Sequence, residues 1–310
     1  MRRLMLCAAL FLAWVVPAQG ACADMPFGRF IVTADTAIRI DRIVSVAHAD
    51  AFLPAGEKAD DGYIIVWATM RNFANLRVSP PTYLFSFDLT DGRSFGGRYE
   101  TDVLGPYSAS GQLRALDDAP NTLAAHESRA VRYVVLNWPK MPIAAMSVHT
   151  SIGVNVRGAR VGQMLPDYTA SDVPLGKYFP LGDVQLRIDQ LTSHRSAQRD
   201  PILRHASNQD RVNGYFVMTA SLRNPFSGRT VRVPAYSPSL DFNDSAGTQS
   251  QAFGPYGPDG RKPAIAALGP GAYATVSWLI TNWVDEAPVV RLSINPVWKL
   301  RLATRTAARS

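Results

Sequence analysis

The chain has 310 residues, a net charge of +7 and two cysteines. Its positive residues are mostly arginines scattered along the sequence, without the dense run or the interleaving with aromatic residues that a nucleic-acid groove shows, so no nucleic-acid partner is predicted. Both cysteines, Cys7 and Cys22, lie within the first 23 residues. Removal of that segment leaves no disulfide framework, and the mature protein must then depend on its hydrophobic cores.

The first 23 residues are typical of a secretory signal peptide. Two arginines follow the initiator methionine, an apolar run comes next, and small residues end in an Ala-x-Ala site at Ala23. The apolar run is shorter than the roughly 20 residues that a transmembrane helix needs. We therefore expect a periplasmic or secreted protein cleaved near Ala23. A lipid on Cys22 is the alternative, although Gln19 stands where a lipoprotein signal normally has leucine.

After this leader the chain repeats itself, once between Asp35 and His149 and again between Asp183 and Ile294. The matched blocks are Asp35, Ile38, Arg39, Ile40, Asp41 with Asp183, Leu186, Arg187, Ile188, Asp189; Gly62-Tyr63 and Arg71-Asn72 with Gly214-Tyr215 and Arg223-Asn224; Gly105-Pro106-Tyr107 with Gly254-Pro255-Tyr256; and Asn137-Trp138 with Asn282-Trp283. The offset is constant within a block and drifts between blocks. This pattern indicates preserved strands joined by variable loops, because a strand cannot absorb an insertion without turning its faces over.

Each repeat is as long as a domain and far longer than a solenoid unit. We predict one domain over residues 24–156, a linker over 157–177 that is rich in glycine, proline and small polar residues, a second domain over 178–300, and a basic tail over 301–310. A unit of this length buries roughly two thirds of the surface of its unfolded chain, so each is expected to close around a core of its own.

Hydrophobic alternation predicts strands rather than helices. Residues 63–72 and 215–223 each have apolar side chains at every second position, which is typical of antiparallel strands with one face toward water. No segment has a convincing helical period with capping residues. The predicted fold is all-β, with two tandem immunoglobulin-like antiparallel β-sandwiches.

The order of these blocks resembles a known family. An opening apolar strand is followed by Gly-Tyr and an alternating strand that ends in Arg71-Asn72, then by Phe87-Asp88 and Asp91-Gly92, and finally by a last apolar strand. This pattern is similar to that of the secreted bacterial immunoglobulin-like domains of unknown function, typified by a mycobacterial immunogenic secreted protein. The resemblance covers both repeats and implies a fold, but it supplies no catalytic residues.

Chemical motifs give little support to an enzyme. The sequence contains no zinc-protease, nucleophile-elbow or phosphate-binding-loop motif, and the segment 243–247 fits a hairpin turn better than a serine nucleophile or a calcium loop. The five histidines have no metal-ligand spacing; Met141, Met146 and His149 would bind copper only if the fold gathered them. A non-enzymatic protein without a cofactor is predicted.

Aromatic residues are the candidate binding residues. Trp138, Trp283, Tyr107 and Tyr256 recur after strands or after Gly-Pro, where we place them in loops at a sandwich end. They either anchor a protein partner, stack on sugar rings, or plug the open ends of the cores. Trp67 lies on the polar face of its strand, where the second repeat has Thr219, which indicates an interface. We therefore expect recognition of a protein partner in the cell envelope; binding of a glycan or small ligand by the loop aromatics is the alternative.

Overall fold

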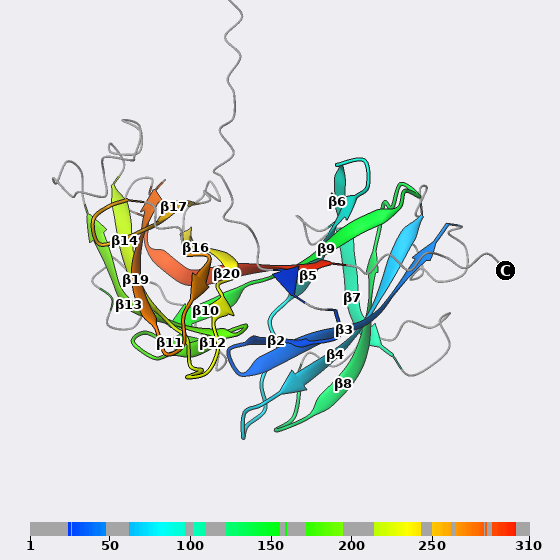
Figure 1. The fold of residues 1–310 in the computed structure, drawn as a ribbon, viewed down its shortest axis with the longest axis horizontal. Coiled ribbons are helices and arrows are strands. Elements are labelled where there is room, and N and C mark those ends of the chain that lie inside the picture. The colour runs from blue at the N-terminus through cyan, green and yellow to red at the C-terminus, as the bar shows by residue number, and fades with distance from the viewer. Residues whose placement is uncertain are drawn as a thin grey trace, which may run out of the picture.

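The computed structural model describes residues 24–25, 27–47, 62–96, 102–109, 122–155, 159, 172–194, 214–242, 250–261, 265–281, 283 and 287–301. In this part of the chain the fold is all-β, without an α-helix, and its strands form mainly antiparallel sheets, with parallel pairing only of β1 with β20 and of β10 with β11 (Figure 1). The all-β prediction is confirmed. The proposed signal peptide, the turn segment 243–247, nearly all of the basic tail and most of the proposed linker lie outside the described residues.

The larger sheet has ten strands and runs through both repeats in the order β17-β19-β14-β13-β12-β2-β3-β4-β8-β7. Its strands in the first repeat are β2 (Phe30–Thr33), β3 (Thr36–Val46), β4 (Tyr63–Asn72), β7 (Val103–Ser108) and β8 (Ser128–Val135). Those in the second repeat are β12 (Phe179–Leu181), β13 (Val184–His194), β14 (Tyr215–Arg223), β17 (Gln251–Tyr256) and β19 (Tyr273–Thr281).

The smaller sheet has eight strands and also runs through both repeats. Its main path is β11-β10-β20-β9-β5-β6, and β1 and β16 also pair with β20. The bounds are β1 (Asp24–Met25), β5 (Tyr83–Leu89), β6 (Ser94–Gly96), β9 (Ile143–Thr150), β10 (Ile152–Asn155), β11 (Val173–Pro174), β16 (Ala235–Phe242) and β20 (Val289–Arg301). A separate two-stranded sheet pairs β15 (Val231–Arg232) with β18 (Ala267–Leu268).

The two large sheets pack face to face like the layers of a sandwich. In the first repeat the ring of Phe85 on β5 meets that of Tyr133 on β8 edge-on, with centroids 4.9 Å apart. In the second, Phe216 on β14 stacks on Phe242 of β16 at 5.9 Å. Such aromatic pairs add about 0.5–1.5 kcal/mol to the stabilisation from the area they bury. The inward side chains of both sheets therefore form the hydrophobic core.

The repeated Arg-x-Asp block has the same structural role in both copies. The register of the β3–β4 ladder shifts at Asp41, and that of β13–β14 shifts at Asp189, so each aspartate is the extra residue of a β-bulge. Each carboxylate accepts hydrogen bonds from the arginine two residues earlier and from a hydroxyl on the next strand. The hydroxyls belong to Thr69 and Ser221. The bulge explains why this block recurs without a gap.

The ten-stranded sheet crosses from one repeat to the other at equivalent residues. Thr33 pairs with Leu181, and these two residues precede Asp35 and Asp183 by the same two positions. Around them the Ala34 N–H donates to the Pro180 carbonyl at 3.1 Å, and the Gly182 N–H donates to the Val32 carbonyl at 2.8 Å. Reciprocal bonds between equivalent residues are the mark of a twofold relation, so the repeats are arranged like the subunits of a symmetric dimer.

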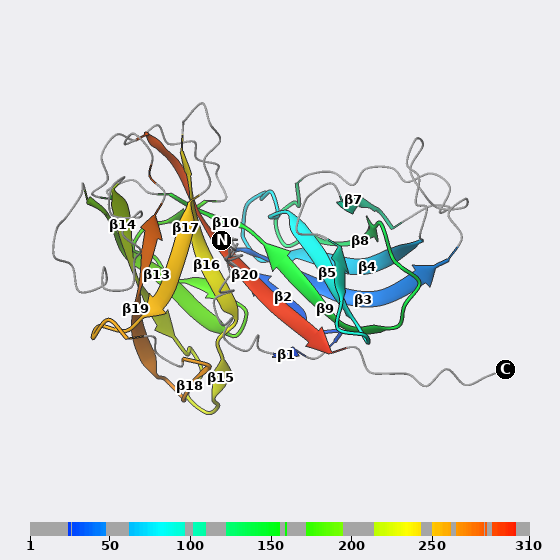
Figure 2. The same cartoon turned by 90° about the horizontal axis from the view of Figure 1, so that it is seen from above.

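The smaller sheet crosses between the repeats in the same way. β9 and β10 together span 143–155, which is equivalent to β20 over 289–301. Val148 pairs with Trp298, and Ile152 pairs with Ile294, so the sixth residue of each segment meets the tenth residue of the other. Figure 2 shows β20 as a long diagonal strand that leaves β16 and β10 and runs on beside β9. Each repeat thus lends the end of its last strand to the sheet of the other.

This exchange differs from the prediction that each repeat closes around its own interior. Buried side chains of both repeats belong to one contiguous cluster, with Ile31, Ile152, Leu181 and Trp298 near the crossing. In the smaller sheet, β9 pairs with β5 of its own repeat on one side and with β20 of the second repeat on the other. Likewise, β20 pairs with β16 of its own repeat and with β9 and β10 of the first. The core is continuous because neither repeat completes its smaller sheet from its own residues.

A buried asparagine holds the loop that follows β4 and β14. The Asn72 side-chain amide donates to the carbonyls of Leu76, Leu123 and Ala124 at 2.7–3.3 Å, and its side-chain oxygen accepts from the Ala74 N–H at 2.8 Å. Asn224 makes the equivalent four bonds in the second repeat. Buried backbone groups must be paired. The repeated asparagine is therefore a structural clamp for this loop.

Candidate functional site

Two of the predicted binding residues, Trp138 and Trp283, close one end of the core in their repeats. Trp283 is 1% exposed, and its indole N–H donates to the Ala287 carbonyl at 2.8 Å. Trp138 is half-buried and donates to the Met141 carbonyl at 2.9 Å. Each indole packs where the side chain of Gly62 or Gly214 would be, because a Cβ there would lie 3.3 or 2.9 Å from the ring. Both glycines also have positive φ, which explains the recurrence of Gly-Tyr together with Asn-Trp.

The other repeated aromatics, Tyr107 and Tyr256, lie within strands β7 and β17 rather than in end loops. Their Gly-Pro peptide bonds are cis, and the register of each edge strand shifts at this point. Both rings pack against the outer side of the ten-stranded sheet, with Tyr63 in the first repeat and Tyr215 in the second. They are 8% and 1% exposed, so neither ring offers a surface for a ligand.

Trp67 is the predicted residue that does lie at an outer surface. It is half-buried on β4 and points away from the core, in a cross-strand row with Arg42 of β3 and Arg132 of β8. The two guanidinium carbons lie 4.7 and 5.2 Å from its ring centroid, within the range of cation–π attraction. The indole N–H is buried without a hydrogen-bond partner.

Arg132 is the unusual member of this row. Its side chain is buried, with the residue 1% exposed, and two of its nitrogens donate to the Ser108 carbonyl, one at 2.9 Å. The third, Nη1, has no partner, and desolvation lowers the pKa of the guanidinium. No ion pair of Arg132 occurs in the described part of the chain. The second repeat has Ser277 at the equivalent place, hydrogen-bonded to Thr219 at 3.4 Å.

Further arginines share this outer side of the sheet, and we call the set the arginine face. Its members alternate along their strands with buried core residues and are Arg39, Arg42, Arg71, Arg132, Arg187 and Arg223. Each guanidinium lies over an aromatic ring, at 4.6–5.2 Å from its centroid. The rings are Phe30, Trp67, Phe73 and Tyr178. The carboxylates among them are the bulge residues Asp41 and Asp189, so the described part of this face carries a positive excess.

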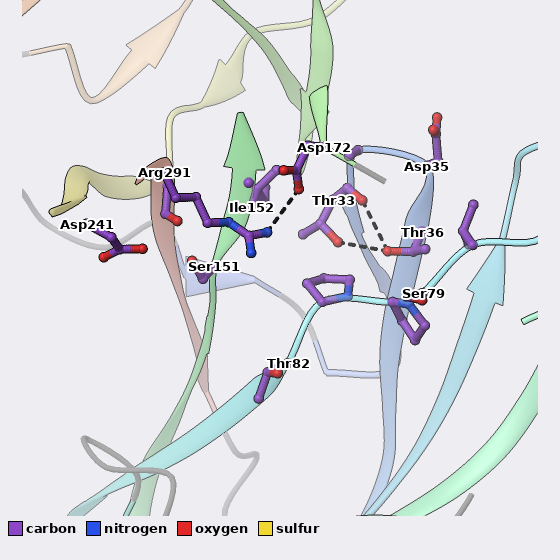
Figure 3. Close-up of a pocket in the computed structure, with 16 residues that line it drawn as sticks. Thr33, Asp35, Thr36, Ser79, Thr82, Ser151, Ile152, Asp172, Asp241 and Arg291 are labelled. Carbon is purple, nitrogen blue, oxygen red and sulfur yellow. Dashed lines mark hydrogen bonds and ion pairs between the residues drawn. The ribbon is translucent and has the colours of Figure 1, made fainter. Parts of the chain in front are cut away.

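A cleft of about 350 Å³ lies where the repeats meet (Figure 3). The first repeat supplies the β2–β3 turn, the segment 78–82 and the start of β10, the second supplies residues of β16 and β20, and the proposed linker supplies Asp172. An ion pair joins Asp172 to Arg291, with 2.9 Å between their atoms, and the Asp172 side chain is 2% exposed. Gly153 leaves the space for this pair, since a Cβ there would lie 2.2 Å from the Asp172 carboxylate. The charges of this wall are thus largely paired.

One carboxylate of the cleft, Asp241, is held in an unfavourable environment. Desolvation raises its pKa, and attraction to Arg291, its cross-strand neighbour, only partly opposes the shift. A carboxyl whose pKa is higher in the folded than in the unfolded state stabilises the fold at low pH. This stability is fully present below the unfolded-state pKa and is lost as pH rises through the folded-state pKa. We therefore expect Asp241→Asn to raise the thermal midpoint at pH 7 slightly, by about 1 °C. The gain should disappear below about pH 4, where the wild-type carboxyl is protonated; calorimetry at both pH values checks this, and an equal gain at both contradicts it.

The cleft has a filled counterpart on the other side of the twofold relation. Ile152 and Ala34 line the cleft, and their equivalents are Trp298 and Gly182. The Trp298 indole is buried and packs onto Gly182, where an added Cβ would lie 3.0 Å from the indole nitrogen. A large ring therefore fills one crevice, whereas a smaller side chain leaves the equivalent crevice open.

The described residues bring together no catalytic or metal-binding set that we recognise. No group of three or more histidine, cysteine, aspartate or glutamate side chains there is arranged to hold a metal ion. The copper alternative is wrong for Met146 and His149, because Met146 is buried in the core whereas His149 lies on the opposite face of β9. There His149 hydrogen-bonds Ser86 at 2.8 Å, on the outside of the smaller sheet and not in the cleft.

No protein-family model matches this chain, and no curated protein is significantly similar to it. Over the described residues, no helix has the length and apolar character needed to cross a membrane.

Proposed function

We propose that this chain is an exported, non-enzymatic binding protein of the bacterial cell envelope, made of two immunoglobulin-like sandwiches. Recognition of a protein partner is assigned to the arginine face around Trp67. Export is supported by the leader-like sequence over residues 1–23, and the binding role by a surface that combines exposed charge with an outward tryptophan.

The strand order supports the immunoglobulin-like assignment. In the first repeat β3, β4, β8 and β7 are neighbours in one sheet, and β5 pairs with β9 in the other. This is the order A-B-E-D opposite C-F that immunoglobulin domains have. In the second repeat β13, β14, β19 and β17 form the same order, opposite β16 and β20. The position of the last strand, G, is taken in each repeat by the end of the other repeat's F strand.

The observation that carries the binding proposal is the row Arg42-Trp67-Arg132. Two arginines without an ion pair in the described residues flank a tryptophan whose N–H has no partner. Folding alone gains little from such a row, because it leaves buried donors unsatisfied. The second repeat shows that the fold does not need it, since Gln190, Thr219 and Ser277 stand at the equivalent positions. A partner that supplies acceptors would meet the exposed guanidinium of Arg42 first, and it would satisfy the buried donors only by displacing the side chains that cover them.

The carbohydrate alternative has weaker support. It rests on four repeated aromatics, but Tyr107, Tyr256 and Trp283 are buried, and Trp138 is half-buried against the core. Stacking on a sugar needs an accessible ring face.

The test is substitution of Trp67 by threonine, which the second repeat carries at this position. We expect Trp67→Thr to keep the fold, as judged by circular dichroism, and to weaken capture of the partner by at least about tenfold. The partner is obtained by cross-linking in an envelope extract, identified by mass spectrometry, and then rebound in purified form. Thr219→Ser at the equivalent place is the control. Equal capture by wild type and Trp67→Thr would overturn the assignment of binding to this face.

A further inference from the structure

We infer that the partner presents an acidic, extended polypeptide segment that lies across both repeats on the arginine face. This inference rests on the proposed function and names the chemistry of the partner. It goes beyond the row around Trp67, because four of the six arginines of the face lie outside that row, two of them in the second repeat.

The charge of the face favours an acidic ligand. Six arginines stand beside two carboxylates, and both carboxylates are already paired, Asp41 with Arg39 and Asp189 with Arg187. The remaining four make no ion pair in the described part of the chain; Arg42 and Arg71 are exposed, Arg223 is half-buried, and Arg132 lies buried beneath the face. Arg223 instead donates to the neutral Gln185 side chain. The unpaired positive charge is therefore spread over both repeats.

The arginines are also held in place before a ligand arrives. Stacking on a ring fixes the plane of a guanidinium without using its N–H groups. Tyr178 holds two of the arginines, because Arg187 and Arg223 lie 4.7 and 4.6 Å from its centroid. Arg187 and Arg223 already donate to Asp189 and Gln185, so a ligand would meet their remaining N–H groups. A planar guanidinium edge matches a carboxylate through two parallel hydrogen bonds. Because the stacked guanidinium groups are already ordered, a ligand with side-chain carboxylates loses less conformational entropy of these side chains when it binds.

The ten-stranded sheet makes this surface continuous. Five steps separate β4, which carries Arg71, from β14, which carries Arg223, and the crossing between β2 and β12 is one of them. Neighbouring strands lie about 4.8 Å apart, so the accessible arginines span roughly 24 Å. An extended chain advances about 3.3 Å per residue, so a segment of about seven residues covers this distance.

The distribution of charge favours a polypeptide over a nucleic acid. Asp41 and Asp189 lie within the face, each beside an arginine that it already neutralises. A nucleic acid carries a negative charge at every phosphate and would place several of them near these carboxylates. An acidic polypeptide instead places neutral or hydroxyl side chains there and its carboxylates at the unpaired arginines.

The test measures binding of a labelled ten-residue polyglutamate peptide to the full chain by fluorescence anisotropy. We expect saturable binding at about 50 mM salt that weakens strongly at about 300 mM, because exposed charges are screened. Arg71→Gln with Arg223→Gln should weaken binding by at least about tenfold. Arg93→Gln with Arg261→Gln removes the same charge from exposed sites away from the face, with side chains 63% and 89% exposed, and should change affinity less than about twofold.

The outcomes separate this inference from the proposed function. Equal losses in the two double variants, or no binding of the peptide by wild type, would overturn the acidic-segment assignment. Tighter binding of a ten-nucleotide single-stranded DNA than of the peptide would overturn the choice of a polypeptide. If Trp67→Thr abolishes capture of the identified partner while Arg71→Gln with Arg223→Gln does not, the inference fails and the proposed function stands.

Discussion

Either repeat expressed without the other is expected to lack a stable folded monomer. Residues 24–155 alone lose the end of β20, with Trp298 and Leu300, and expose Ile152 and Val154 of their own β10. Each of these four buried side chains contributes roughly 1.5–3 kcal/mol, so the loss is on the order of 8 kcal/mol. This is comparable with the whole stability of a typical domain, about 5–15 kcal/mol. An unpaired β9 edge would add a tendency to associate.

Size-exclusion chromatography with light scattering and circular dichroism check this expectation. The isolated repeat should be unfolded or should form a dimer through the exchanged strand segments, and addition of the second repeat should restore a folded one-to-one complex. The intact chain at the same concentration is the control. A cooperatively folded, monomeric first repeat would show that the exchanged strands are not needed to complete its core.

Loss of the buried asparagine clamp is the second large effect. In Asn72→Ala, three carbonyls and the Ala74 N–H lose their partner in a buried loop. Each unsatisfied buried group costs about 1–3 kcal/mol, and partial access of water reduces the sum, so we expect a loss of about 3 kcal/mol or more. Asn224→Ala should cost a similar amount, because it removes the same four bonds from the second repeat. Denaturant unfolding monitored by tryptophan fluorescence measures both.

A nearby exposed asparagine gives the matched control. Asn75 lies three residues after Asn72 and hydrogen-bonds His126 at the surface at 2.8 Å. Asn75→Ala is therefore expected to change stability by less than about 0.5 kcal/mol. If Asn72→Ala were as mild as this control, the buried amide would not be what holds the loop.

Most strands of the fold could be predicted from the sequence, whereas their assembly could not. The alternation over Tyr63–Asn72 and Tyr215–Arg223 depends on neighbouring residues alone, and both strands are confirmed. The choice of partner for the second half of β20 is a tertiary event. Period-two alternation continues through that strand whether it pairs with β16 of its own repeat, as it does up to Val297, or with β9 of the other, as it does from Trp298. A hydrophobic pattern therefore carries no sign of the exchange.

The candidate site was predicted only in part for a related reason. Trp67 could be identified because a large aromatic side chain falls at a polar position of an alternating strand. The arginines of the face, from Arg39 to Arg223, are separated by long stretches of sequence and look scattered. They are gathered only because two bulged strands and the β2–β12 crossing place them on one sheet surface. One signal in the sequence could have found them. Each arginine stands beside an apolar position of an alternating strand, as Trp67 and Thr69 do in β4, and so lies on the outer face of the sheet.

The contrast between Trp298 and Ile152 shows what covalent fusion of two similar halves permits. In an assembly of two identical subunits, any substitution near the axis is made twice, so a ring that closes one crevice closes both. A single polypeptide has no such constraint, so one crevice can be filled by a buried side chain while the equivalent crevice stays open to solvent. The same freedom allows one half to carry Gln190, Thr219 and Ser277 where the other carries a tryptophan between two arginines, so a repeated scaffold presents two chemically different halves to its surroundings.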